Sequence, residues 1–269
     1  MSPSLRERLI VGLSPAGVQF ARYGRGLRPR LAESVTVPCG DSGAQPWRSA
    51  VDTLARELPR LAARVPVCEV VLSNHFVRFQ LLPWRPELRT REERAALAQA
   101  QYRGVFGPAA QGWTVRLAAS AFGATTLACA VDRALVEELA RLLKSAGARP
   151  AAIEPYLAAV FNRWRRELKA PPFWLVLLEP GRLWVGLMGA TGWSNVSARR
   201  IGSDPLAETL AVLAQEAAVN GAGPKAVPTY LIAAGLDRES ARTLREGGIK
   251  VLATAPDALL SLDEAHGLH

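Results

Sequence analysis

The pattern of apolar and polar positions predicts one order of strands and helices that occurs twice along the chain. The order is strand, tight turn, strand, turn, strand, helix, and it covers residues 9–64 and again 173–219. Each copy is followed by further alternating strand and helix patterns, which are typical of an α/β protein. The repetition predicts two equivalent lobes. A chance recurrence of hairpins within one mixed α/β domain would give the same pattern.

The helices inside and between these copies carry apolar residues at helical spacing. In the helix expected at 47–64, Pro59 favours a kink or a break. The helix expected at about 90–105 should bury Ala96, Leu97, Ala100 and Phe106, and the helix that follows the strand expected at 194–201 should carry Leu206, Leu210, Leu213 and Ala217 on its apolar side. We expect a first lobe at 1–170 with an inserted subdomain at about 85–150, and a second lobe at 171–269.

Composition places the chain among folded proteins with an unusual charge. The chain has 269 residues, 49% hydrophobic and 21% charged, and a formal net charge of +9. Such a composition excludes a disordered chain. The charge allows a nucleic acid, an anionic membrane surface or an acidic protein as partner, but the arginines are scattered and lie in no nucleic-acid-binding module, so we expect no nucleic acid partner.

The longest apolar runs are of strand length, and Gly12, Ser14 and Pro15 interrupt the first of them. A membrane helix needs about 18–20 consecutive apolar residues, and a signal peptide needs an uninterrupted apolar core. We therefore expect a soluble, cytoplasmic protein.

Few residues are suited to metal or nucleophilic chemistry. The three cysteines are far apart and form no CxxC motif, and two of the three histidines lie in the last four residues. A zinc site, a disulfide framework and a histidine-based triad are therefore not expected. The common phosphate-binding and hydrolase motifs are also absent from the sequence.

The two tight turns are the candidate phosphate sites, because hairpin turns can hold phosphates through backbone N–H groups. Hydrolysis would also need a carboxylate at the first turn to hold Mg²⁺ and position water. Residues 11–19 contain no Asp or Glu. The second turn keeps Glu179 and Gly181, but Pro180 between them has no N–H to donate. Arg182 is a further candidate for contact with a phosphate, although an arginine in a turn is more often solvated.

The most unusual segment is residues 70–84, in which Ser73-Asn74-His75 separates two apolar runs. His75 has no evident nucleophile or carboxylate partner, so a strand-end histidine bonded to backbone is favoured over a catalytic base. We predict a partner-binding surface formed by Asn74, Phe76, Arg78 and Trp84, because aromatic and arginine side chains often anchor interfaces. The alternative is a central strand whose aromatic side chains all pack inward.

Several of these stretches resemble the actin-like assembly proteins of type IV pili (PilM) and the cytoplasmic domain of the type II secretion protein GspL. The most specific match is a helix followed by Ala146-Gly147-Ala148-Arg149-Pro150, a short strand through Ile153-Glu154-Pro155, and another helix. Weaker matches are the opening with Val18-Gln19-Phe20, the strand into Leu81-Leu82-Pro83, the run 127–131, the turn Leu178-Glu179-Pro180-Gly181 and the late segment 230–235. The resemblance implies an actin-like (ribonuclease H-like, duplicated) two-lobed α/β fold with mixed sheets and a nucleotide cleft.

The sequence departs from this family where the nucleotide would bind. Gly12 stands where the pilus protein has an Asp, Glu179-Pro180-Gly181 where it has Asp-x-Gly, and Ala234-Gly235 where it has a Gly-Gly pair. The resemblance therefore implies a degenerate nucleotide site. Its residues would be Ser14, Gln19, Glu179, Gly181 and Gly235, and we expect no bound cofactor.

The resemblance implies a non-catalytic scaffold at the inner face of a bacterial membrane, in a pilus-like or type II-like secretion machine. The scaffold would dock the cytoplasmic tail of an inner-membrane assembly protein, an assembly ATPase is a further candidate partner, and membrane contact would be indirect. The alternative is an actin-like protein that still binds ATP as a conformational ligand. A sugar- or acyl-kinase relative would need a carboxylate in the first turn.

Overall fold

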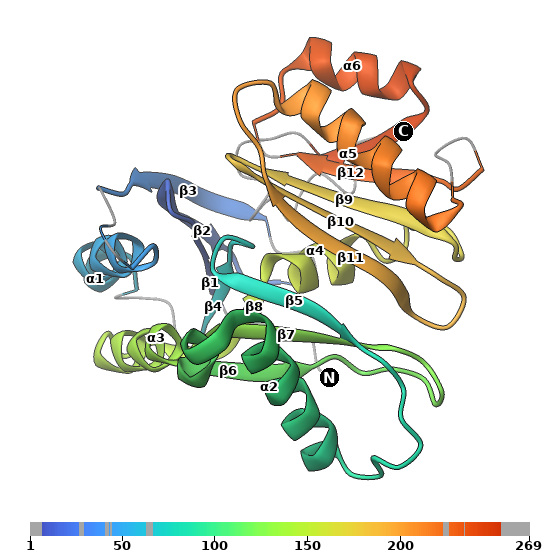
Figure 1. Cartoon of the computed structure of the whole chain (residues 1–269). Helices are drawn as coiled ribbons and strands as arrows, with labels where there is room; N and C mark the ends of the chain where they lie inside the picture. The colour runs from blue at the N-terminus through green and yellow to red at the C-terminus, as the bar shows by residue number, and fades with distance from the viewer. Residues whose placement is uncertain are drawn as a thin grey trace. The chain divides into compact units, whose positions relative to one another are not determined.

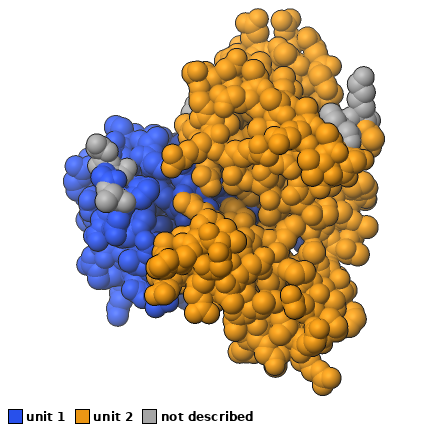
Figure 2. Space-filling view, viewed as in Figure 1, with its two compact units in different colours: residues 1–77, 132–165, 259–269 blue, residues 78–131, 166–258 orange. Residues whose placement is uncertain are grey.

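A computed structural model describes residues 7–26, 30–40, 43, 45–62, 67–222, 226–233 and 235–253. The chain folds into two compact units, each formed by separate stretches of sequence. In its described part, the first unit contains residues up to Val77 and Asp132–Arg165, and the second contains Arg78–Val131 and the residues from Arg166 onward (Figure 2).

A five-stranded sheet forms the centre of the first unit, with strand order β3-β2-β1-β4-β8. These strands are β1 (Arg8–Leu13), β2 (Gly17–Tyr23), β3 (Leu31–Pro38), β4 (Val67–Leu72) and β8 (Arg149–Pro155). The central strand β1 pairs antiparallel with β2 on one side and parallel with β4 on the other. Helices α1 (Arg48–Ala62) and α3 (Arg133–Ser145) lie on one face of the sheet and α4 (Tyr156–Trp164) on the other (Figure 1).

The second unit contains a sheet with the same construction, in the order β11-β10-β9-β12-β13. Its strands are β9 (Phe173–Glu179), β10 (Arg182–Met188), β11 (Trp193–Arg200), β12 (Thr229–Ala233) and β13 (Ile249–Ala253). The central strand β9 pairs antiparallel with β10 and parallel with β12, as β1 does with β2 and β4. Helices α5 (Pro205–Asn220) and α6 (Arg238–Glu246) cover one face through Leu213 and Leu244. The duplication predicted from the hydrophobic pattern is confirmed.

The first copy carries an insertion between β4 and α3. It contains β5 (Val77–Leu82), α2 (Arg91–Phe106), a 3₁₀ turn (Gly107–Gly112), β6 (Trp113–Leu117) and β7 (Thr126–Asp132). The three strands form a separate sheet in the order β5-β7-β6. Helix α2 packs on this sheet through Ala98 and Tyr102, and the Tyr102 hydroxyl lies 2.9 Å from the carbonyl oxygens of both Arg78 and Ala128.

The insertion, from Arg78 to Val131, belongs to the second compact unit together with the sheet around β9. The Phe79 and Trp184 rings are 6.0 Å apart, and the Thr125 hydroxyl donates to the Trp193 carbonyl oxygen. These contacts join the three-stranded sheet to β10 and β11. The expected boundary at residue 170 and the expected insert at about 85–150 stay predictions.

Three details of the sequence interpretation differ from the structure. Helix α1 continues through Pro59 to Ala62, so the proline does not break it, and a kink stays a prediction. Helix α2 buries Ala98 and Tyr102, whereas Ala96 and Ala100 are exposed and Phe106, in the last turn, is 37% exposed. In α5, Leu210 is 40% exposed.

Within the described ranges, each helix is too short or too polar to cross a bilayer.

The face of the second sheet opposite α5 and α6 carries a tight aromatic contact. The Trp184 and Trp193 rings meet edge to face, 5.4 Å apart. A Cβ atom on Gly186 would lie 2.4 Å from the Trp184 ring and 2.8 Å from the Trp193 ring. Both rings are buried, so neither can move aside easily.

We expect Gly186→Ala to lower the free energy of unfolding by about 1–3 kcal/mol, the usual cost of an overpacked core. Urea denaturation of the whole chain measures this change. Gly104→Ala is the matched control, because Gly104 lies within α2 and an added Cβ meets nothing within 4 Å. That control should raise stability by about 0.5–1 kcal/mol through helix propensity. Equal effects of the two substitutions would contradict the packing described here.

Candidate functional site

The first tight turn joins β1 to β2 and is closed by its own serine. The Ser14 backbone N–H donates to the Gly17 carbonyl oxygen at 3.0 Å, and the Gly17 N–H donates to the Ser14 hydroxyl at 3.1 Å. The same hydroxyl donates to the Gly17 carbonyl oxygen at 2.9 Å. A glycine suits position 17, because an added Cβ would lie only 3.0 Å from the Val37 carbonyl oxygen on β3. The Ser14 side chain therefore holds the turn together.

The second tight turn joins β9 to β10 and places a carboxylate opposite an arginine. Glu179 and Arg182 are register partners, and Gly181 between them has φ 74°. Proline followed by a positive-φ glycine is typical of a type II turn. Glu179 is only 2% exposed although it carries a carboxylate. A buried carboxylate is costly unless cations or hydrogen-bond donors compensate it.

Register extends this pair into a row that includes a second arginine. Arg182 lies opposite Glu179 on one side and opposite Arg200 of β11 on the other. Arg199, the residue before Arg200, points to the other face, where it forms an ion pair with Glu216 of α5 at 3.0 Å. Glu179, Arg182 and Arg200 therefore lie side by side on the face away from α5 and α6.

Arg78 joins this row from the inserted sheet. Phe79 follows Arg78 on β5, and its ring contacts the ring of Trp184. Trp184 lies on the same face of β10 as Arg182, so this contact places the start of β5 near Arg182. Burial, followed by repulsion from Arg200, lowers the pKa of the Arg78 guanidinium. The pKa of Arg182 is lowered by burial first and then by Arg78 and Arg200, while Glu179 acts in the opposite direction. The row therefore holds three arginines and one carboxylate, and this excess of positive charge favours an anionic ligand.

The remaining residues assigned to the degenerate nucleotide site lie elsewhere. Gln19 is on β2, in register with Gly12, and Gly235 follows β12 with φ 78°. Ala234, the first residue of the expected Ala-Gly pair, lies outside the described residues. Ser14 and Gln19 are in the first unit, whereas Glu179, Gly181 and Gly235 are in the second. Their assignment to one nucleotide site stays a prediction.

The segment that follows β4 is tied to the end of β1. The Ser73 N–H donates to the Leu13 carbonyl oxygen at 2.9 Å, and the Phe76 N–H donates to the Ser73 carbonyl oxygen at 3.0 Å. The His75 N–H donates to the Ser73 hydroxyl at 3.2 Å. Asn74 is 1% exposed and Phe76 is 8% exposed. Of the four residues predicted to bind a partner, Arg78 and Trp84 are the more accessible ones.

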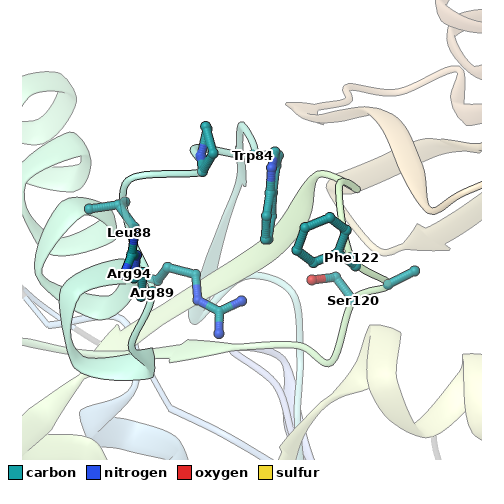
Figure 3. A pocket seen from close by; sticks show the side chains of 8 residues that line it. Trp84, Leu88, Arg89, Arg94, Ser120 and Phe122 are labelled. Atoms are coloured by element: carbon teal, nitrogen blue, oxygen red, sulfur yellow. The ribbon is translucent and has the colours of Figure 1, made fainter.

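Trp84 lies beside a pocket that sequence analysis did not predict. The pocket has a volume of about 430 Å³ and is formed between the segment that leads into α2 and the loop between β6 and β7 (Figure 3). Its lining residues are Trp84, Pro86, Leu88, Arg89, Arg94, Ser120, Ala121 and Phe122. Phe122 is 91% exposed and meets Trp84 edge to face at 4.7 Å. The sequence signal that could have suggested this pocket is the aromatic residue Phe122 in a polar, turn-like segment, directly before Gly123.

The thiols show no feature of a reactive site. Cys39, Cys68 and Cys129 form no disulfide, and burial raises the pKa of the Cys68 thiol to about 12. Burial also raises the pKa of Cys129. Among the residues that the structure describes, no three His, Cys, Asp or Glu side chains are grouped so that they could hold a metal ion.

Comparison with known proteins identifies the fold. No protein-family model and no curated protein sequence matches the chain. A solved PilM–PilN type IV pilus biogenesis complex contains a similar chain, with a TM-score of 0.64 and 14% identity over 96% of this chain and 90% of that one. The cytoplasmic domain of EpsL, an inner membrane component of the type II secretion system of Vibrio cholerae, matches with a TM-score of 0.55 and 14% identity, over 85% of this chain and 82% of that one.

A third similar structure is a Bacteroides thetaiotaomicron protein with an actin-like ATPase fold and unknown function. It has a TM-score of 0.57 and 12% identity over 95% of this chain and 93% of that one. The actin-like α/β fold and the resemblance to PilM and the GspL cytoplasmic domain are therefore confirmed at the level of the fold.

We expect the purified protein to hydrolyse no ATP above the buffer background, because residues 11–19 offer no carboxylate to organise Mg²⁺ and water. Phosphate release with MgATP measures this. A turnover that survives repeated purification and disappears in Glu179→Ala would show that the second turn supplies the missing group.

Proposed function

We propose that this chain is a non-catalytic cytoplasmic scaffold, peripheral at the inner membrane, of a bacterial pilus-like or type II-like secretion assembly. It docks the cytoplasmic tail of an inner-membrane partner, and an assembly ATPase is a second candidate partner. The observation that carries the proposal is the first turn. Its only hydroxyl closes the turn itself, and it contains no carboxylate, so it does not fit the requirements of a Mg-nucleotide centre.

The fold supports this proposal. Two of the similar structures belong to assembly machines, one a pilus biogenesis complex and one a component of a secretion system. Fold alone does not determine activity, so the two turns and the accessible surface carry the proposal. The surface offers Arg78 and Trp84, of the residue types that most often anchor protein interfaces.

A second function, binding of ATP as a conformational ligand, is favoured by the row of Glu179, Arg182, Arg200 and Arg78. Guanidinium groups can hold a phosphate without a metal. In this function ATP would stabilise one conformation in proportion to its differential affinity for it, without being consumed.

Titration calorimetry separates the two functions. The whole chain is titrated with MgATP and, separately, with synthetic peptides that correspond to cytoplasmic tails of inner-membrane assembly proteins from the same genome. Heat with a tail peptide and none with MgATP supports the scaffold. Heat with MgATP alone supports the conformational-ligand function and contradicts the scaffold.

We expect Arg78→Ala to abolish tail binding while the melting temperature stays within a few degrees, because Arg182 and Arg200 still lie beside the Glu179 carboxylate when Arg78 is removed. Co-purification with the tagged partner and a thermal melt measure the two effects. Arg103→Ala is the matched control, since Arg103 is exposed in the last turn of α2, in the same unit. Unchanged tail binding in Arg78→Ala, or loss of the fold, would show that Arg78 acts in the structure and not in partner binding.

A further inference from the structure

The pocket beside Trp84 combines an apolar wall with cationic groups. Trp84 and Phe122 form the aromatic wall, and Leu88 adds an aliphatic side chain. Figure 3 shows the Arg89 guanidinium extending into the space next to Trp84 and Phe122. A volume of about 430 Å³ lies within the range of about 300–1,000 Å³ that is usual for ligand pockets. The pocket is therefore large enough for one or two side chains of a partner.

One wall is held in place by the start of α2. Thr90 and Glu93 form a capping box, in which the Glu93 N–H donates to the Thr90 hydroxyl at 3.1 Å. The Glu93 carboxylate accepts from the backbone N–H groups of Arg89 and Thr90 at 2.8 and 2.9 Å. These bonds lower the pKa of Glu93, so its carboxylate stays ionised to a lower pH than a free glutamate does. The backbone that carries Arg89 is therefore fixed before any partner arrives.

The opposite wall is held in place by short-range bonds in the loop between β6 and β7. The Ser120 and Thr126 hydroxyls are 2.7 Å apart, and the Ala124 N–H donates to the Ala121 carbonyl oxygen at 3.2 Å. Gly123 adopts φ 79°, which the turn requires directly after Phe122. The exposed Phe122 ring is thus presented on an ordered turn. A preformed aromatic anchor point reduces the entropic cost of binding.

The cationic groups of the pocket lack acidic partners within the described ranges. Neither Arg89 nor Arg94 forms an ion pair there, and the nearest carboxylate in sequence, that of Glu93, is engaged by two backbone N–H groups. The Arg94 Nε donates only weakly, at 3.3 Å, to the Thr90 carbonyl oxygen. Two guanidinium groups are therefore available beside an apolar wall, and their positive charge favours binding of a carboxylate.

We propose that this pocket binds an acidic peptide segment of a partner protein, anchored by one apolar side chain. The leucine or aromatic side chain packs on Trp84 and Phe122, and a neighbouring carboxylate accepts hydrogen bonds from Arg89 and Arg94. The proposal rests on the proposed scaffold function and assigns it a second contact surface, on the insertion, with a stated chemistry.

A peptide fits the surrounding charge better than a lipid surface does. Residues 85–94 contain four arginines and three glutamates, so the segment has a small net charge. Binding to anionic membranes through a polybasic patch takes about four to eight unopposed Lys or Arg residues. The available cations are instead concentrated at one hollow beside two aromatic rings, which matches a single carboxylate next to an apolar group.

Fluorescence anisotropy of a dye-labelled peptide tests the proposal with the whole chain. The probe is a short synthetic peptide in which a leucine and a phenylalanine are flanked by aspartates, and the control peptide has lysines in place of the aspartates. We expect only the acidic peptide to bind. Arg89→Ala and Phe122→Ser should each weaken it about tenfold or more, the usual effect of losing a charge-assisted hydrogen bond or an aromatic anchor. Arg103→Ala should leave its affinity unchanged.

Three results would overturn the proposal: equal binding of both peptides, no binding of either, or affinity for the acidic peptide that Arg89→Ala and Phe122→Ser leave unchanged. In the second case, co-sedimentation with vesicles that contain phosphatidylglycerol would identify a lipid surface. Self-association that Phe122→Ser abolishes would identify a second copy of this chain as the occupant. Both substitutions replace exposed side chains, so a circular dichroism spectrum should confirm that each variant is folded.

The scaffold proposal and the pocket proposal can fail separately. If inner-membrane tails bind and the acidic peptide does not, the scaffold stands and the pocket proposal is wrong. If the acidic peptide binds at the pocket and no tail binds, the pocket stands as a peptide site and the scaffold function is wrong.

Discussion

Burial of one central strand in each sheet is the constraint on which the rest of the structure depends. Strand β1 pairs on both edges, and its residues from Leu9 to Leu13 are all buried. Strand β9 is buried along its whole length, from Phe173 to Glu179. A strand with neighbours on both edges and packing on both faces can carry polar side chains only at its ends. Polar side chains of these two strands are therefore expected at the strand ends and in the turns that follow them.

The two turns meet this constraint in different ways. After β1, the chain turns with the Ser14 hydroxyl bonded to Gly17, and the turn carries no side-chain charge. After β9, a carboxylate remains at the last buried position, and arginines on neighbouring strands compensate it. The duplicated fold thus has one turn without charged side chains and one turn with charged side chains. Equivalent backbone positions have diverged in charge while the strand pairing around them is the same.

The sequence was sufficient to predict most helices and strands, because local signals define where they begin and end. Turn residues bound each strand, and Asp or Thr residues begin helices α2, α3, α5 and α6 by accepting a backbone N–H bond. Leu210 was expected on the buried side, but the buried residues of α5 are Thr209, Leu213, Glu216 and Ala217, and Leu210 is 40% exposed. Helical spacing alone does not show where the buried stripe is centred. The pairing of β4 with β8, separated by the whole insertion, also has no local signal. The row of arginines was missed for the same reason, since it exists only in the register of β9, β10 and β11.

The chemistry of the charged turn also determines what a nucleotide could do there. Carboxylates bring Mg²⁺ and an attacking water to a phosphate, whereas guanidinium groups bind a phosphate but neither hold the metal ion nor position the water. With arginines predominating around Glu179, an anion bound at this turn would be retained and left intact. The scaffold and the ATP-binding alternatives therefore agree that no hydrolysis occurs, and a hydrolysis assay cannot separate them. The two alternatives differ in whether a bound anion stabilises the second unit, so measurements of binding and of stability distinguish them.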